Sequence, residues 1–300
     1  MSRQKSISGA HYRTLGGTVF TVFNITILAL LALLCAFPVV HMLSVSFSNQ
    51  SAVAANRVNL LPVGFNIASY RMVARRAAFW RAFRISVLRV AVGISINTVL
   101  TVLVAYPLSK SVREFPSRRY YVWLLIFAMI FDGGLVPNYL LVRDLKLFDT
   151  IWALVLPGAV PIYNVILVMN FMKQLPDSIE EAAEVDGATF FQRFARIVLP
   201  LCKPSIATVV LFSFLGHWNG WFDGKIYNNN TANYPLQTYL QALLSNTDAT
   251  NASEAIENAL TNVKTLQAAQ LFLTMLPILM IYPFLQKYFT KGLTIGAVKG

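Results

Sequence analysis

The chain has 300 residues, of which 56% are hydrophobic and only 13% are charged, and this balance excludes an ordinary soluble domain. The formal net charge of +12 would suggest a nucleic-acid partner in a soluble chain. Here we interpret much of it as loop charge that orients membrane helices and meets the lipid bilayer, so we expect an all-α integral membrane protein with no nucleic-acid partner.

Six apolar stretches of about 20 residues match the roughly 30 Å hydrocarbon thickness of a bilayer, and each is expected to be a transmembrane helix. Their approximate bounds are residues 19–40, 90–108, 120–141, 151–172, 205–222 and 266–289. A polar N-terminal segment, residues 1–17, precedes one transmembrane domain, residues 18–300. Within the third stretch, residues 132–134 and Pro137 should unwind or bend the helix.

The fourth and fifth stretches are separated by a polar segment, residues 174–204, whose pattern predicts two helices joined by a turn. Asp177 with Glu180 has the spacing of a capping box, and acidic residues in a first turn are favoured by the helix dipole. Gly187 suits the left-handed position that ends such a helix. We therefore expect a first helix that is capped by Asp177 and ends at about Gly187.

A second helix is predicted directly after this turn. Thr189 with Gln192 repeats the capping-box spacing. The helix should run over residues 190–199 and stop at Pro200 and Pro204, because proline lacks the amide hydrogen that a helix interior needs. Residues 174–204 are thus predicted to form a capped helical hairpin.

Seven residues of this hairpin follow the pattern E-A-A, three residues, G, nine residues, I-x-L-P: Glu181, Ala182, Ala183, Gly187, Ile197, Leu199 and Pro200. In this pattern the hairpin resembles the EAA loop of permease subunits from binding-protein-dependent ATP-binding-cassette importers. An ordinary amphipathic hairpin between two membrane spans is the alternative.

The resemblance implies that residues 178–187, Asp186 among them, form a coupling helix that sits in a cleft of a cytoplasmic ATPase and transmits its motion. Small side chains at Ala182 and Ala183 would let this helix lie close against a partner surface. Glu181 could pair with basic groups on that surface. All seven pattern positions are therefore expected to serve ATPase coupling.

Other stretches extend the likeness over nearly all of the chain after the first span: residues 131–139, 152–158, 218–222, 282–289 and 296–300. They are similar to the carbohydrate branch of the family and, within it, to the LplC and YtcP group, which takes polysaccharide-derived and uronate-containing oligosaccharides, alginate among them. The resemblance implies six transmembrane helices of the type I importer permease kind in the cytoplasmic (inner) membrane of a bacterium.

The resemblance also implies a second, different permease subunit, a cytoplasmic ATPase dimer that binds ATP and magnesium, and an extracytoplasmic substrate-binding protein. An outer loop, residues 223–264, corresponds to the loop that reaches into the binding protein. The tail, residues 290–300, corresponds to a segment that contacts the ATPase through Gly296, Lys299 and Gly300.

Lysine and arginine in the N-terminal segment, the loop 109–119 and the tail place both termini in the cytoplasm. The segment 46–89 is assigned to the outside although it holds seven arginines and no acidic residue: Arg57, Arg71, Arg75, Arg76, Arg81, Arg84 and Arg89. Within it, residues 69–89 are expected to form one basic amphipathic helix at the membrane interface. A positive rim would speed the capture of an acidic oligosaccharide such as an alginate fragment; binding to anionic lipid is the alternative.

The sequence contains no recognisable catalytic motif. The phosphate-binding pattern Gly-x4-Gly-Lys-Ser/Thr is absent, and His11, His41 and His217 are too scattered for a metal site. We therefore expect no enzymatic activity, no catalytic residue, and no metal or cofactor on this chain.

Polar residues within the apolar stretches are candidates for the translocation path, because each costs free energy unless it faces protein or water. The candidates are Asn97, Asn138, Asn164, Trp218 and Asn219. Hydrogen bonds between helices are the alternative for each of them. His217 is likewise open between an interface contact and a substrate contact.

The expected mechanism is alternating access, in which ATP closes the ATPase, the hairpin is pulled, and the spans rock to open the path outward. A secondary transporter driven by an ion gradient is an alternative that predicts inverted repeats and charged residues in mid-span. A membrane scaffold without transport is a second alternative, although it would have no need of a capped hairpin.

Overall fold

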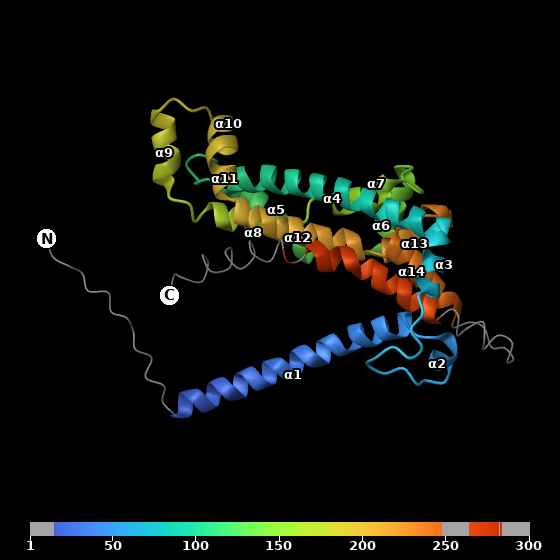
Figure 1. Cartoon of the computed structure of the whole chain (residues 1–300). Coiled ribbons are helices and arrows are strands. Elements are labelled where there is room, and N and C mark those ends of the chain that lie inside the picture. Colours follow the sequence, from blue (N-terminus) through green and yellow to red (C-terminus); the bar gives the residue numbers. More distant parts are fainter. Residues whose placement is uncertain (1–14, 248–263, 282, 284–300) are drawn as a thin grey trace. The chain divides into compact units, whose positions relative to one another are not determined.

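The computed structural model describes residues 15–247, 264–281 and 283. The chain divides into two compact units, Met1–Ser69 with Glu254–Phe272 and Tyr70–Ser253 with Leu273–Gly300. Within the described ranges all regular structure is helical, as the composition predicts (Figure 1).

The α-helices are α1 (Leu15–Ser46), α2 (Gln50–Ala54), α3 (Ala68–Arg75), α4 (Ala77–Ser109), α5 (Arg118–Ile130), α6 (Leu135–Asp144), α7 (Ile151–Val155), α8 (Ile162–Met172), α9 (Asp177–Val185), α10 (Phe190–Arg193), α11 (Leu199–Leu201), α12 (Lys203–Asn219), α13 (Phe222–Tyr227) and α14 (Leu236–Thr247). Short 3-10 turns follow at Leu156–Gly158 and Thr231–Asn233, and a π-helical segment, Phe194–Val198, joins α10 to α11. A further helix covers Lys264–Ile281.

In the first unit, the loop after α1 folds back onto the end of that helix. The Ser44 hydroxyl donates to the Leu60 carbonyl at 2.6 Å, and the Ser48 hydroxyl accepts from the Val63 amide at 3.0 Å. These two bonds hold the loop against the end of α1.

In the second unit, α4 is the central helix, and α8 and α12 pack along it (Figure 1). Their shared core is made of small and branched apolar side chains, which permits close helix packing. Its fully buried members include Ala105, Val165, Val168, Cys202 and Val209. The hairpin α9–α10 projects from the end of this bundle at which α4 ends (Figure 1).

Six membrane spans agree with the length and hydropathy of the described helices. Three helices, α1, α4 and Lys264–Ile281, are long and apolar enough individually. Three more spans are bent pairs: α5 with α6 at 110°, α7 with α8 at 48°, and Phe190–Leu201 with α12 at 76°. The interruption expected at residues 132–134 is present, and there the Asp132 carboxylate accepts from the Gly134 amide at 3.0 Å.

Two expected helices differ from those observed. The single amphipathic helix expected over residues 69–89 is wrong, because α3 ends at Arg75 and α4 begins at Ala77 and continues to Ser109. The break falls at Arg76, which has an extended ψ of 104°. The arginines of α4 do not delimit the membrane span, since a helix continues through a charged residue when its charge is paired or reaches water.

The hairpin's second helix also differs from expectation. It does not stop at Pro200 but continues to Leu201 and bends at Cys202. The π-helical turn Phe194–Val198 changes the hydrogen-bond spacing just before Pro200, which lowers the cost of its missing amide hydrogen. Pro204 lies in the first turn of α12, where no amide hydrogen is required.

Asp149 fastens the start of α7 to the segment after α13. Its carboxylate accepts from the Asn230 amide at 3.0 Å and from the Asn229 side chain at 3.2 Å. These bonds, with the Asn230 amide first, hold the pKa of Asp149 below its usual range. The first part of the expected outer loop 223–264 is therefore held to Asp149 by these hydrogen bonds. Its later part, residues 248–263, lies outside the described residues.

Candidate functional site

The turn of the hairpin has the geometry that its sequence predicts. Gly187 has a φ of +80°, its amide donates to Glu184, and the Ala188 amide donates to Ala183 at 2.9 Å, which is the Schellman arrangement. Thr189 and Gln192 form the predicted capping box, with bonds of 3.3 and 2.8 Å. The two arms are therefore joined by a turn that carries both the Schellman bonds and the capping-box bonds.

The expected cap at Asp177 is wrong. Asp177 lies inside α9, and its N-cap is Pro176, which has no side-chain donor or acceptor. Glu180 does not reach back to the helix start, because its carboxylate is bound elsewhere: it forms an ion pair with Lys110 and accepts from the Tyr106 hydroxyl at 3.0 Å.

Tyr106 and Lys110, both at the end of α4, attach the hairpin to the bundle. The Lys110 ammonium lies 4.4 Å above the Tyr106 ring, a cation–π distance. The same ring packs on Phe190 and Phe194 of the second arm, with centroid distances of 4.9 and 4.8 Å. A second ion pair, Glu184 with Arg193, ties one arm to the other. None of these contacts is predicted by the sequence pattern of the hairpin.

The opposite side of α9 has no such partner among the described residues. Val185 is 88% exposed and Ile179 37%, and Glu181, Ala182 and Asp186 are exposed beside them. Ala183 is buried and so faces this chain, which differs from the expectation that both alanines face a partner. In the second arm Ile197 and Leu199 are half-buried, and Pro200 is exposed.

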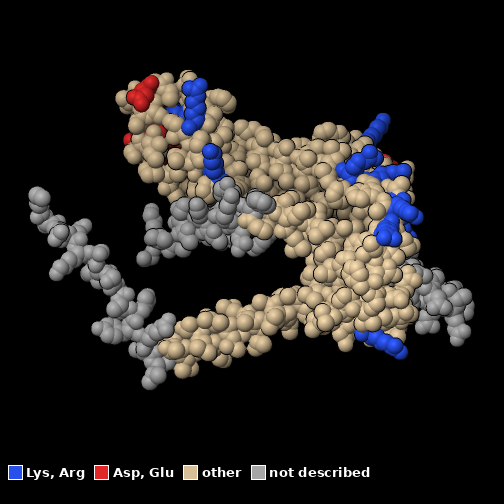
Figure 2. All heavy atoms as spheres, in the orientation of Figure 1, with Lys and Arg blue, Asp and Glu red and all other residues tan. Residues whose placement is uncertain are grey.

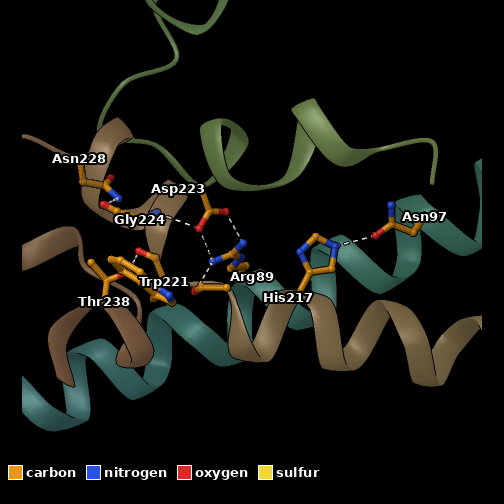
Figure 3. A network of polar contacts seen from close by, with 9 residues as sticks. Arg89, Asn97, His217, Trp221, Asp223, Gly224, Asn228 and Thr238 are labelled. Atoms are coloured by element: carbon orange, nitrogen blue, oxygen red, sulfur yellow. Dashed lines mark hydrogen bonds and ion pairs between the residues drawn. The ribbon is translucent and has the colours of Figure 1, made fainter. Parts of the chain in front are cut away.

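A second polar group lies within the bundle, around a cavity of about 410 Å³ lined by α4, α7, α8, α12 and α13 (Figure 3). Arg89 of α4 forms an ion pair with Asp223 of α13 and donates to the Gly220 carbonyl at 2.9 Å. Only 5% of the Arg89 side chain is exposed, so this charge is held inside the protein.

Two path candidates line this cavity. The Asn97 amide donates to the carbonyls of Gly158 and Ala159 at 2.7 and 3.0 Å, where α7 and α8 are broken apart, and its oxygen lies 2.6 Å from the His217 ring. A β-carbon at Gly93 would overlap that ring, so glycine permits the close approach of α4 and α12. Asn164 is buried at the cavity wall.

The other candidates do not line this cavity. Asn138 and Asn219 are exposed, and Trp218 is buried with its indole donating to the Thr274 carbonyl at 3.2 Å. Gly296, Lys299 and Gly300 of the tail lie outside the described residues, so their expected ATPase contact stays a prediction. Across the described ranges, no cluster of histidine, cysteine and carboxylate groups could hold a metal ion.

Three residues of the cavity lining are not among the candidates predicted from sequence: Arg89, Asp223 and Ser213. Arg89 is expected at the surface with the other arginines of residues 46–89, but the structure buries it. The sequence does contain a signal for this ion pair. Arg89 directly precedes the apolar stretch 90–108, and Asp223 directly follows the apolar stretch 205–222.

Comparison with known proteins identifies the chain's relatives. Residues 6–295 match the model of the family described as binding-protein-dependent transport system inner membrane component. The chain belongs to this family. It is similar to the protein LplC of Bacillus subtilis (strain 168), with 38% identity over 291 residues that cover 96% of this chain and 98% of LplC.

Two further relatives of this inner membrane component carry descriptions of a substrate. The polygalacturonan/rhamnogalacturonan transport system permease protein YtcP of Bacillus subtilis (strain 168) is 34% identical over 275 residues, covering 91% of this chain and 96% of YtcP. A chain from the crystal structure of a bacterial ABC transporter involved in the import of the acidic polysaccharide alginate superposes with a TM-score of 0.83 and 30% identity, covering 93% of this chain and 99% of that chain.

Family membership establishes the location, the role and two of the partners of the chain. The chain is a multi-pass component of the bacterial inner membrane and a non-catalytic part of an ATP-driven importer. It works with an ATPase and a substrate-binding protein, and the prediction of an all-helical permease fold is confirmed.

Proposed function

We propose that this chain is one of the two permease subunits of an oligosaccharide importer, and that the exposed side of α9 docks in a cleft of the ATPase. The observation that carries this proposal is the division of α9 into two sides. One side exposes Ile179, Glu181, Ala182 and Val185. The other is fastened to α4 through Glu180, so a force applied to α9 reaches the central helix of the bundle.

The mechanism is alternating access driven by differential binding. ATP binds more tightly to the closed ATPase dimer than to the open one. When the dimer closes, the clefts of its two subunits move together, and one of these clefts holds α9. The movement is transmitted through α9 to α4, α8 and α12, which rock to open the path to the outside. Hydrolysis reverses the movement and returns the path to the cytoplasm.

A variant of Glu180 tests the attachment. Glu180→Gln keeps an acceptor for Tyr106 but removes the charge that pairs with Lys110, whose side chain is only 9% exposed. We expect this to weaken the attachment by about 1–3 kcal/mol and to lower the oligosaccharide imported per ATP hydrolysed. The measurement is paired uptake and ATPase assays in proteoliposomes that contain the whole importer.

The matched control for that experiment is Asp177→Asn, which removes a carboxylate from the same helix. Asp177 forms no ion pair within the described part of the chain. It should leave the ratio of uptake to hydrolysis unchanged. Equal ratios in both variants would show that Glu180 does not couple the two processes.

A second, different permease subunit completes the path in this proposal. The support is α5, in which no residue is buried and which exposes Tyr120, Trp123, Phe127 and Ile130. An apolar helix of this kind needs either lipid or another subunit beside it. We propose that part of the exposed surface of α5 contacts lipid and that part of it contacts the second permease subunit.

The proposed substrate is an acidic oligosaccharide. Five arginines of α3, the break after it and the start of α4 make no ion pair within the described ranges: Arg71, Arg75, Arg76, Arg81 and Arg84. Figure 2 shows basic side chains gathered at the end of the bundle opposite the hairpin. If the hairpin is cytoplasmic, this surface faces outward and concentrates anions. The alginate and polygalacturonan descriptions of the relatives agree with this choice.

Uptake of matched oligosaccharides tests the substrate. We expect a uronate trisaccharide to be imported faster than a neutral trisaccharide, by about ten-fold or more at low salt, because steering is electrostatic. The advantage should shrink on raising ionic strength and on Arg71→Gln/Arg75→Gln substitution. Equal uptake of both sugars at every salt concentration would leave anionic lipid as the partner of these arginines.

A further inference from the structure

Another cavity lies in the first compact unit, between the end of α1, the loop after α2 and the first turn of the helix Lys264–Ile281. Its volume is about 430 Å³, within the range of roughly 300–1,000 Å³ that is usual for small-molecule sites. All of its lining residues belong to this one unit. The polar part of the lining consists of His41, Asn56, Asn59 and Lys264, and valines supply the rest.

The polar part of this lining is suited to an anion. Lys264 is exposed and forms no ion pair within the described residues. The Nδ1 atom of His41 donates to the Asn59 carbonyl at 2.8 Å, which orients the ring and leaves Nε2 for another partner. The described ranges of this unit, residues 15–69 and 264–272, contain no carboxylate. A negatively charged group would therefore meet hydrogen-bond donors and no repelling charge in this part of the chain.

The cavity lies at the level where two membrane spans leave the hydrocarbon region. The apolar part of α1, Gly16–Ser46, has 31 residues, which exceeds the roughly 20 that span a bilayer, and His41 lies near its end. Lys264 is the first residue of the other span, where a charged side chain stays at the level of the headgroups. Phe37 is 52% exposed and stacks on the His41 ring, with a centroid distance of 6.2 Å. The lipid-facing surface of α1 therefore runs directly up to the cavity.

Exposed apolar side chains continue from the cavity along the loop. Leu60 and Leu61 directly follow Asn59 of the lining and are 50% and 78% exposed. Further along, Phe65 is 71% exposed and stacks on Phe47, with a centroid distance of 5.3 Å. A free phosphate ion could fill the polar cavity but would leave these side chains in water. A molecule with an anionic head and acyl chains would cover both.

We propose that this cavity binds the phosphate group of an anionic phospholipid such as phosphatidylglycerol, in the leaflet at the Ser46 end of α1. In the expected topology this is the outer leaflet. The phosphate accepts hydrogen bonds from the Lys264 ammonium and the His41 ring, and the acyl chains lie along α1. A zwitterionic lipid fits less well, because its own ammonium would repel Lys264. This site is separate from the arginines of α3 and α4 and does not depend on the transported sugar.

Lys264→Gln tests the site, because Lys264 is exposed and makes no ion pair in the described ranges whose loss would disturb the fold. We expect its affinity for phosphatidylglycerol to fall about five-fold or more, the effect of losing one basic group beside anionic lipid. Lys264→Arg should keep most of the affinity, because it keeps the charge. The measurement is native mass spectrometry of the whole importer while phosphatidylglycerol is titrated into a phosphatidylcholine background.

The matched control is Arg57→Gln, which removes another exposed cation of the same unit that does not line the cavity. It should leave the affinity nearly unchanged. Equal losses in Lys264→Gln and Arg57→Gln would overturn the site, because only the overall positive charge would then matter. Displacement of the bound lipid by inorganic phosphate would overturn the assignment to a lipid in favour of a free anion. Displacement by a uronate trisaccharide would overturn it in favour of a sugar.

A photoactivatable lipid gives the location of the site as a separate readout. Phosphatidylglycerol that carries a diazirine close to its glycerol is expected to label peptides that contain residues 37–41 or 56–61 of the unaltered chain in the whole importer. This labelling should fall in Lys264→Gln by a factor similar to the loss of affinity. Labelling confined to other segments would contradict the site, even if the total amount of bound lipid were unchanged.

Discussion

Gly187→Val is expected to lower ATP-driven uptake by about five- to thirty-fold, with the stimulation of ATP hydrolysis by the binding protein reduced to a similar extent. Gly187 has a φ of +80°, a region that β-branched residues avoid. Forcing valine there costs about 1–2 kcal/mol or more, equivalent to roughly a 5- to 30-fold shift in a local equilibrium. The hairpin would lose the turn that keeps α9 aligned with α10.

The control is Gly187→Asn, because asparagine tolerates the left-handed region better than other residues with a side chain. We expect it to keep a substantial part of the uptake. Both variants are compared in proteoliposomes, with circular dichroism and subunit stoichiometry as checks of assembly. Full uptake by the valine variant would show that the geometry of this turn is not needed for coupling.

Local features of the hairpin could be predicted from sequence because their determinants are local. The Thr189–Gln192 capping box and the left-handed Gly187 each depend on residues within one turn, and both are present. The interruption at residues 132–134 was predictable for the same reason, since glycine and proline act on the backbone near them.

Long-range pairs could not be predicted in this way. Glu180 pairs with Lys110 across 70 positions, and Arg89 pairs with Asp223 across 134. Sequence spacing assigned Glu180 to a capping box and Arg89 to the membrane surface. In both cases a tertiary partner determined where the side chain lies, and no local pattern encodes that partner.

Asp223→Leu is expected to be among the most destabilising substitutions in the bundle. Arg89 would keep a charge that is 5% exposed while losing its carboxylate partner, and its Nε already lacks a hydrogen bond within the described residues. Removing one member of a buried ion pair costs about 3–5 kcal/mol. Arg89→Met should cost less, because Asp223 is 29% exposed and can be solvated from the cavity.

The double variant Arg89→Met/Asp223→Leu distinguishes the free energy of the ion pair from the cost of burying each charge alone. Removing both charges leaves no unpaired ion, so its cost should fall well below the sum of the single variants. The exposed pair Arg143–Asp144, with side chains 55% and 65% exposed, is the control, and its disruption should cost about 0–1 kcal/mol. The measurement is denaturant unfolding of the assembled complex in nanodiscs. Additive costs for the Arg89 and Asp223 variants would mean that the two charges do not stabilise one another, and that Arg89 is solvated through the cavity instead.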